Sequence, residues 1–292
     1  MKMREKFVET FRIIYLVLCA VLIIGTAAGF FMLSLDSIDP NVKMEMLSIS
    51  LIVAMISLAL AMWVKKLIVK PLKHILMNKI SHDIKGFRYI PDAGLPVQFF
   101  EDSGFIRGYD EYCSDNFITG KVENGKDFII SEILVKQVIL SEDNTRSESI
   151  LFDGIFGVLD AKKINTFYMD ITPDFKNKFA NRVFADFKKM LGNKHIVRLE
   201  NPEFERYFEV FSDNQIEARK IITLEFMEKL LEVRKNVGKN ISIIYVGNKI
   251  YFFIQHGVLA DTRKLLLFGP SEKVVKETSK LIQNISEAVE LL

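Results

Sequence analysis

The sequence is short of the residues from which disulfide frameworks and metal sites are built. It has two cysteines and four histidines in 292 residues. Cys19 lies inside an apolar stretch and Cys113 lies outside it, so the pair cannot staple an extracellular fold. The histidines show no His-x-x-x-His or His-Glu-x-x-His spacing, and no Cys-x-x-Cys occurs. We therefore expect no metal and no other cofactor.

Signatures of nucleotide binding and of serine hydrolases are also missing. No Gly-x-Gly-x-x-Gly, Walker A or Gly-x-Ser-x-Gly pattern occurs. The glycines of the segment FDGIFGV, Gly154 and Gly157, interrupt an apolar run and predict a β-bulge rather than a phosphate loop.

A concentrated basic face is absent as well. The net charge is +2, from 39 Lys/Arg and 37 Asp/Glu. Residues 1–74 hold nine Lys/Arg and five Asp/Glu, so the remainder holds 30 and 32 and carries −2. Because nucleic-acid binding needs clustered cations, no nucleic-acid partner is expected.

Two long stretches without any charged residue dominate what is present. Ile13–Leu33 and Leu47–Val64 hold 21 and 18 residues without Asp, Glu, Lys, Arg or His. About 20 apolar residues in a helix span the hydrocarbon core of a bilayer. The sequence therefore predicts a transmembrane hairpin over residues 13–64 with a short external loop at 34–46. A cleavable signal peptide is the alternative for the first stretch, but its apolar part would be shorter.

The charges that flank the hairpin predict its orientation. The first 12 residues carry Lys2, Arg4, Lys6 and Arg12. Residues 65–85 are basic and amphipathic, and their inner-face anchors are Lys65, Lys66, Lys70 and Lys73. In the loop between the stretches, Lys43 is the only Lys or Arg. Since cytoplasmic flanks are enriched in Lys and Arg, we expect a multi-pass protein of the bacterial plasma membrane with both termini cytoplasmic. Its first partner would be the bilayer with its anionic headgroups.

Small residues in the first stretch predict close packing of helices. Gly25 and Gly29 form a small-xxx-small spacing. They would pack the two helices of one hairpin together or, alternatively, join copies into a homo-oligomer. Because neither span holds a charge, a pore would require many copies.

The rest of the chain, residues 86–292, predicts one cytoplasmic α+β domain with an antiparallel sheet and packed helices. The expected strands are 117–121, 128–140, 150–160, 166–171, 195–199, 241–246 and 249–255. Turns are expected at Asn124-Gly125, at 141–144 and at Gly247-Asn248. The expected helices are 175–191, 203–208, 212–218, 223–238 and 271–292, and Pro71 should kink or restart the helix that precedes the domain.

The run LENPEFERYFEVFSDNQIEARKIIT, the helix FMEKLLEV and the hairpin ISIIYVGNKIYFFI carry a resemblance, together with FITGKVENGKDFIISEILV and ILFDGIFGVLDAKK. The chain resembles, over residues 95–255, an uncharacterised bacterial membrane-protein family known as domain-of-unknown-function family 3137. The resemblance implies a membrane-anchored cytoplasmic domain without an established activity. It also implies a LemA-type membrane protein as a partner.

The densest polar cluster of the domain lies between residues 200 and 219. Its interaction candidates are Glu203, Phe204, Tyr207, Phe208, Asp213, Glu217 and Arg219. We favour a structural role, in which Ser212 and Asp213 cap a helix and the aromatic residues form a helical turn docked on the sheet. The same residues could border a peptide groove.

The function expected from these features is a membrane-tethered cytoplasmic interaction or regulatory module rather than an enzyme. The first alternative is a membrane-bound hydrolase that uses Glu203, Asp213 and Glu217, which requires that these carboxylates converge in a pocket. The second alternative is a component of an oligomeric channel.

Overall fold

The computed structural model describes residues 2–34, 39–84, 86–121, 127–140, 146–161, 167–173, 195–237, 240–255, 259 and 261–290. The helix expected at 175–191 and the turns expected at 124–125 and 141–144 lie outside these residues. Two compact units are present. The first comprises Met1–Lys79 with Ala260–Lys276, and the second comprises Ile80–Leu259 with Glu277–Leu292.

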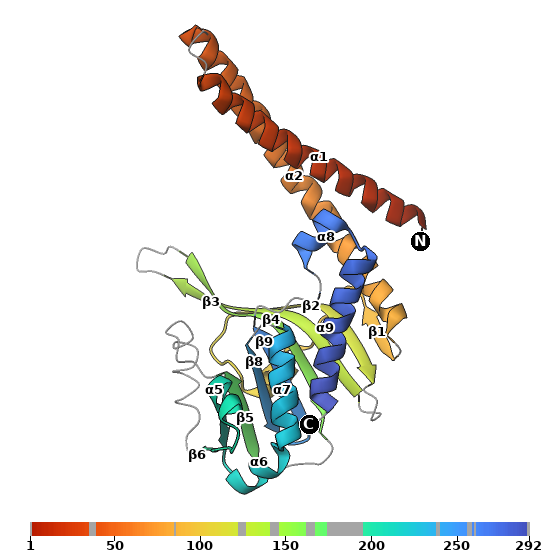
Figure 1. The fold of residues 1–292 in the computed structure, drawn as a ribbon, viewed down its shortest axis with the longest axis vertical. Coiled ribbons are helices and arrows are strands. Elements are labelled where there is room, and N and C mark those ends of the chain that lie inside the picture. Colours follow the sequence, from red (N-terminus) through yellow and green to blue (C-terminus); the bar gives the residue numbers. More distant parts are fainter. Residues whose placement is uncertain are drawn as a thin grey trace. The chain divides into compact units, whose positions relative to one another are not determined.

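The first unit is built on two long helices, α1 (Lys2–Leu33) and α2 (Pro40–Asp83) (Figure 1). Both are long and apolar enough to cross a membrane. The restart expected at Pro71 is wrong, because α2 continues through this residue. The proline costs one backbone hydrogen bond, but Leu72 and Leu76 just beyond it are buried and hold the helix in place. Since α2 begins at Pro40, it also takes up part of the predicted loop.

A later segment belongs to the same unit. Helix α8 (Thr262–Phe268) lies in it, and α9 (Glu272–Glu290) starts there. The sequence had assigned residues 260–276 to the cytoplasmic domain. They associate with the hairpin because Arg12 and Lys79 donate hydrogen bonds to backbone carbonyls of Leu267 and Pro270.

The second unit contains an antiparallel sheet, which confirms the predicted α+β class. Among the described residues it has nine strands in the order β1-β2-β3-β4-β9-β8-β5-β7-β6. Their bounds are β1 (Phe87–Ile90), β2 (Glu111–Lys121), β3 (Asp127–Leu140), β4 (Arg146–Asp160), β5 (Tyr168–Pro173), β6 (His195–Ile196), β7 (Phe208–Ser212), β8 (Ile241–Val246) and β9 (Lys249–Gln255). The expected β8–β9 hairpin is confirmed, and Gly247 in its turn has the positive φ that such turns require.

Four short helices accompany the sheet among the described residues of this unit: α3 (Val97–Ser103), α5 (Pro202–Tyr207), α6 (Gln215–Ile221) and α7 (Leu224–Val237). The aromatic core on one face of the sheet gathers around Phe253. Its ring stacks on Phe105 and Phe156, with ring centroids 3.9 and 4.7 Å apart. Phe100 of α3 closes the cluster by edge contacts with Phe156 and Phe253.

Glycine in β4 has a different role from the one predicted. The bulge expected at Gly154 and Gly157 is wrong, because β4 pairs in regular register with β3 and β9 through both residues. A Cβ at Gly157 would overlap the ring of Phe252 on the neighbouring strand. The glycine therefore makes room for an aromatic side chain. The register shifts lie elsewhere, between Asp115 and Ile118 in β2 and between Val135 and Lys136 in β3, opposite Leu151 of β4.

Candidate functional site

The predicted cluster at 200–219 folds as a helix followed by a strand. Asn201 caps α5, since its side-chain oxygen accepts a hydrogen bond from the Phe204 amide at 3.0 Å. Phe204 is fully buried and stacks on Phe208, with ring centroids 4.9 Å apart. Phe208, however, belongs to β7 rather than to a helical turn, so that expectation is wrong. It pairs with Pro173 of β5, and all residues of β7 except Glu209 are buried.

Ser212 and Asp213 tie two strands together instead of capping a helix. The Asp213 carboxylate accepts a hydrogen bond from the Tyr168 amide at 2.9 Å, and the Ser212 hydroxyl donates to the Tyr168 carbonyl at 2.8 Å. Asn214 is the actual cap of α6 and accepts a hydrogen bond from the Glu217 amide at 3.2 Å.

The remaining members of the cluster have separate local contacts. Glu217 forms an ion pair with Lys220 at 2.7 Å, and Arg219 donates to the carbonyl of Arg198 at 3.3 Å. The guanidinium of Arg234 lies over the ring of Tyr207, 4.1 Å from its centroid. Glu203 is exposed on the first turn of α5. Within the described residues no three His, Cys, Asp or Glu side chains form a group that could hold a metal ion. The convergence that the hydrolase alternative requires is thus not seen among them.

One buried acid was missed by sequence reasoning. Asp170 lies on β5, which pairs with β7 on one side and β8 on the other, and it is fully buried. Burial and then the negative charge of Asp170 raise the pKa of Tyr168 above its usual range. The segment Tyr-Met-Asp-Ile-Thr reads as an ordinary strand, so no local signal marks this acid.

Gly29 of α1 faces α2, and the backbone carbonyl of Gly25 contacts the same helix. The Ser50 hydroxyl donates a hydrogen bond to the Gly25 carbonyl at 2.7 Å, and a Cβ at Gly29 would overlap the Ser50 side chain. Both predicted packing residues thus lie at the contact of the two helices of one hairpin.

The basic residues that flank the two charge-free stretches lie at a similar level along the pair of helices. Phe11 of α1 lines a hollow of ≈ 300 Å³ together with Leu67 and Pro71 of α2. Because the two helices run antiparallel, Arg12 lies near the level of Lys65, at the end of both charge-free stretches. The four predicted anchors lie on α2, and among them Lys65, Lys66 and Lys70 are exposed and Lys73 is half-buried.

Arg12 connects this level to α8. Its guanidinium pairs with the Glu9 carboxylate and donates to the Leu267 carbonyl at 2.8 Å. Beside it lies a hollow of ≈ 360 Å³ whose charged lining is Glu5, Lys6, Glu9 and Lys79. Sequence reasoning missed this arrangement because Arg12 and Leu267 lie 255 residues apart.

A ribbon of two strands extends beyond the neighbouring strands of the sheet (Figure 1). We define this β-arm as residues 137–140 of β3 and 146–150 of β4. The pairing of β3 with β2 ends at Lys136, and the pairing of β4 with β9 starts at Gly154. Hence no described strand pairs with residues 146–153 on the outer side of β4. Leu140 and Ile150 are 68% and 61% exposed.

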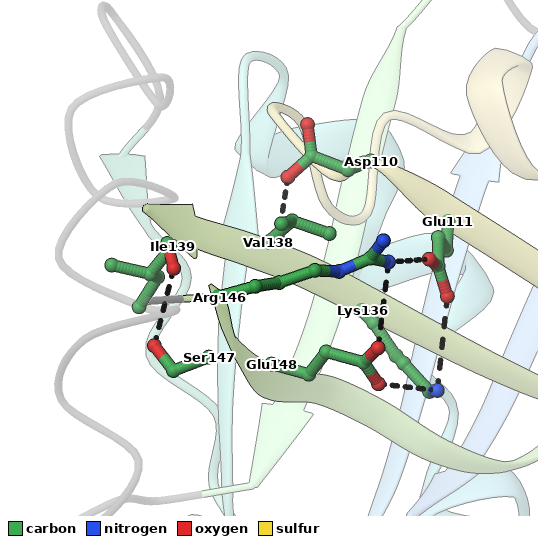
Figure 2. Close-up of polar contacts among 8 residues, drawn as sticks. All are labelled: Asp110, Glu111, Lys136, Val138, Ile139, Arg146, Ser147 and Glu148. Carbon is green, nitrogen blue, oxygen red and sulfur yellow. Dashed lines mark hydrogen bonds and ion pairs between the residues drawn. The ribbon is translucent and has the colours of Figure 1, made fainter. Parts of the chain in front are cut away.

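Four alternating charges lie along the β-arm and the adjoining ends of β2 and β3 (Figure 2). Lys136 contacts Glu148 at 2.8 Å and Glu111 at 3.7 Å, and Arg146 contacts Glu111 at 2.7 Å and Glu148 at 3.4 Å. The hydrogen bond from Lys136 lowers the pKa of Glu148 and in turn raises the pKa of Lys136. The Asp110 carboxylate accepts a hydrogen bond from the Val138 amide at 2.7 Å and covers the outer edge of β3.

Among the described residues, the β-arm therefore presents one edge covered by Asp110 and one open edge. Cross-strand partners share a face of a sheet, so Leu140 opposite Arg146 and Ile150 opposite Lys136 lie on the face that carries the ion pairs. An open edge beside exposed apolar side chains is the surface to which an extended peptide adds as a further strand. Sequence reasoning placed β3 and β4 but did not single out their shared end.

Comparisons with known proteins bear on the second half of the chain. Residues 150–291 match the model of the family described as "Protein of unknown function (DUF3137)". The predicted resemblance to this family is confirmed over these residues. The DUF3137 match runs from β4 to α9 and includes the 200–219 cluster, whereas residues 95–149 of the predicted resemblance lie outside it.

More distant comparisons add little to the DUF3137 assignment. No curated protein matches the chain. The crystal structure of the mycobacterial trehalose monomycolate transport factor A, TtfA, is similar at 9% identity with a TM-score of 0.39. The similarity covers 77% of this chain and 96% of TtfA, and it is too low to assign a shared fold.

Proposed function

We propose that this protein is a membrane-anchored module that binds a partner protein through the open edge of the β-arm. The observation that carries the proposal is the outer side of β4 at residues 146–153, with which no described strand pairs, beside the exposed Leu140 and Ile150. Long apolar edges invite another chain to pair, and proteins cover such edges unless they serve binding.

The anchor is the hairpin of α1 and α2. Apolar side chains such as Ile23 and Met55 are 67% and 71% exposed, which suits a lipid environment and not water. The cations at Arg12, Lys65 and Lys66 flank the charge-free stretches and support a cytoplasmic position for both ends.

The partner would supply an extended segment with apolar residues at alternate positions. Main-chain hydrogen bonds to β4 would give affinity, and contacts with Leu140 and Ile150 would give selectivity. Because the ion pairs beside them balance one another, a strongly charged partner gains little at this edge. A LemA-type membrane protein is the partner that the family resemblance implies, and it is the first to test.

Site-specific crosslinking tests the partner site. A photoreactive residue at Leu140 or Ile150 of the full chain in native membranes should give the same discrete adduct. The matched control is Ile216 on α6, which is 69% exposed but remote in the fold of the same unit. Adducts of equal yield at Ile216, or none at the β-arm, would contradict the proposed binding edge.

Cysteine labelling tests the anchor and its orientation separately. In a chain that lacks Cys19 and Cys113, Asn41→Cys in the first turn of α2 should react with a membrane-impermeant maleimide added outside spheroplasts. Ile216→Cys should react only after lysis. The reverse pattern would overturn the orientation without affecting the β-arm result.

A further inference from the structure

Helix α8 has an exposed face that changes in chemistry along its length. Arg263 and Lys264 of the first turn are exposed, and so are Leu267 and Phe268 of the last turn. Since residues four apart lie on one helical face, each cation is followed by an apolar side chain on the same face. Leu267 and Phe268 retain 56% and 63% of their accessible surface.

The orientation of this face is fixed by the rest of the helix. Leu265 and Leu266 are buried, so the opposite face is packed into the unit. The Asp261 carboxylate caps the helix by accepting a hydrogen bond from the Arg263 amide at 2.9 Å. Gly269, with φ of 62°, ends it. Neither end can turn the exposed face inward without losing these contacts.

The apolar end of α8 lies where the hairpin enters the apolar stretch. Arg12 donates to the carbonyl of Leu267 at 2.8 Å, and Ile13 is the first residue of the charge-free stretch of α1. The Leu267 carbonyl thus lies within reach of the Arg12 side chain, and Arg12 directly precedes Ile13 at the predicted boundary between water and lipid. Lys65, exposed on α2, lies near the same level.

We propose that α8 is a membrane-surface helix, in which Leu267 and Phe268 insert at the headgroup boundary and Arg263 and Lys264 contact anionic lipid phosphates. This inference rests on the membrane anchor of the proposed function, but not on the partner site. It adds a third contact with the bilayer, made by a segment that follows the sheet of the second unit in sequence.

The bilayer is the favoured occupant for two reasons. The last turn of α8 lies beside the end of the charge-free stretch of α1, since Arg12 donates to the Leu267 carbonyl, and this places Leu267 and Phe268 next to the headgroups of a membrane that holds the hairpin. The cations on the same face match the charge of anionic headgroups, and Phe and Leu are the apolar residues typical of surface helices. A protein partner would need to fit beside the hairpin at the headgroup level.

Depth-dependent fluorescence quenching tests this position in the full chain. In a Cys19→Ala, Cys113→Ser background, single cysteines replace Phe268, Ile23 and Ile216 and carry an environment-sensitive probe. The protein is reconstituted in vesicles of phosphatidylcholine and phosphatidylglycerol, with quenching groups at different depths of the acyl chains. We expect quenching of position 268 by shallow quenchers, of position 23 by deep quenchers, and of position 216 by neither.

The three positions separate the possible failures. If position 23 is quenched and position 268 is not, the membrane-surface role of α8 is overturned and the anchor stands. If the probe at position 268 shifts to shorter wavelength without lipid quenching, a protein covers it and the inference is likewise wrong. Absence of quenching at position 23 overturns the anchor and with it this inference.

The double variant Arg263→Gln, Lys264→Gln tests whether the cations of the first turn of α8 contact lipid phosphates. The double variant should lose the quenching gained on adding phosphatidylglycerol, and should match the parent in pure phosphatidylcholine. Equal quenching of both proteins in the mixed vesicles would contradict the role assigned to these cations.

Discussion

Apolar side chains take opposite positions in the two units. In the sheet unit, Phe156 and Phe253 are buried against each other and against Phe100. In the hairpin, Phe30 and Met55 are exposed. The sheet therefore buries its apolar side chains against one another, whereas the hairpin exposes them to the surrounding solvent or lipid. The sheet unit is therefore stabilised by contacts within its own chain, whereas the stability of the hairpin depends on the solvent around it.

Glycine, in contrast, has the same role in both units, which is to make room for a neighbouring side chain. Gly157 makes room for the Phe252 ring between two strands, and Gly29 makes room for Ser50 between two helices. Each permits a close approach that a Cβ would prevent. Substitutions at matched positions should therefore affect stability in the sheet unit and helix packing in the hairpin.

The largest effect is expected in the aromatic core. Phe156→Ala should lower the free energy of unfolding of the sheet by about 3–5 kcal/mol, because it leaves a cavity between Phe100 and Phe253. The matched change Ile23→Ala in the hairpin should leave the same transition within about 0.5 kcal/mol. Urea unfolding of the full chain in detergent, followed by the β-sheet circular dichroism signal, measures both. Equal losses would remove the distinction between the units.

Overpacking should have the next largest effect. Gly157→Ala adds a Cβ that overlaps the ring of Phe252, and we expect a loss of about 1–3 kcal/mol in the same unfolding measurement. Adding Phe252→Leu should recover part of this loss, since the two changes share one space. Strict additivity of the two changes would show that the overlap is not the cause.

In the hairpin, the corresponding substitution should change geometry more than stability. Gly29→Val should separate α1 from α2, because its side chain overlaps Ser50. Gly25→Ala is the matched control, since a Cβ there meets nothing within 4 Å. The distance distribution between spin labels at Ile23 and Ile52 should broaden in the first variant and stay unchanged in the second. Identical distributions in all three proteins would contradict the packing role of Gly29.

The smallest effect concerns the charges of the β-arm. Lys136 lowers the pKa of Glu148 below its ordinary value of 4.5. A lowered carboxyl pKa stabilises the folded arm above the unfolded pKa, and this contribution is lost as the pH falls through the folded value. The ¹³C carboxyl resonance of Glu148 should therefore titrate at lower pH than in Lys136→Met. Coincident titrations would show that this ion pair does not persist in solution.

Local sequence signals predicted the elements whose boundaries they define. Gly247-Asn248 placed β8 and β9 to the residue. The helix expected at 223–238 is α7, and the Thr223 hydroxyl before its first residue accepts a hydrogen bond from the Phe226 amide. The charge-free stretches predicted two long apolar helices. These features depend on neighbours in sequence, which a single sequence displays.

What sequence reasoning missed depends on contacts between distant segments. The pairing of β4 with β9 and the bond from Arg12 to α8 join residues far apart in the chain. Phe208 was assigned to a helical turn because its spacing from Phe204 fits a helix, but pairing with β5 places it in a strand. Pro71 was expected to kink or restart the helix, and α2 continues through it without a restart.

The central claim is that the apolar face of the hairpin contacts lipid while the sheet unit remains in water. Power-saturation spin-label spectroscopy of the full chain in lipid vesicles tests it directly, with nitroxides at Ile23, Met55 and Ile216. The account predicts that oxygen relaxes the labels at 23 and 55 more than a water-soluble nickel complex does, and that the order reverses at 216. Stronger relaxation by the nickel complex at 23 and 55 would contradict it.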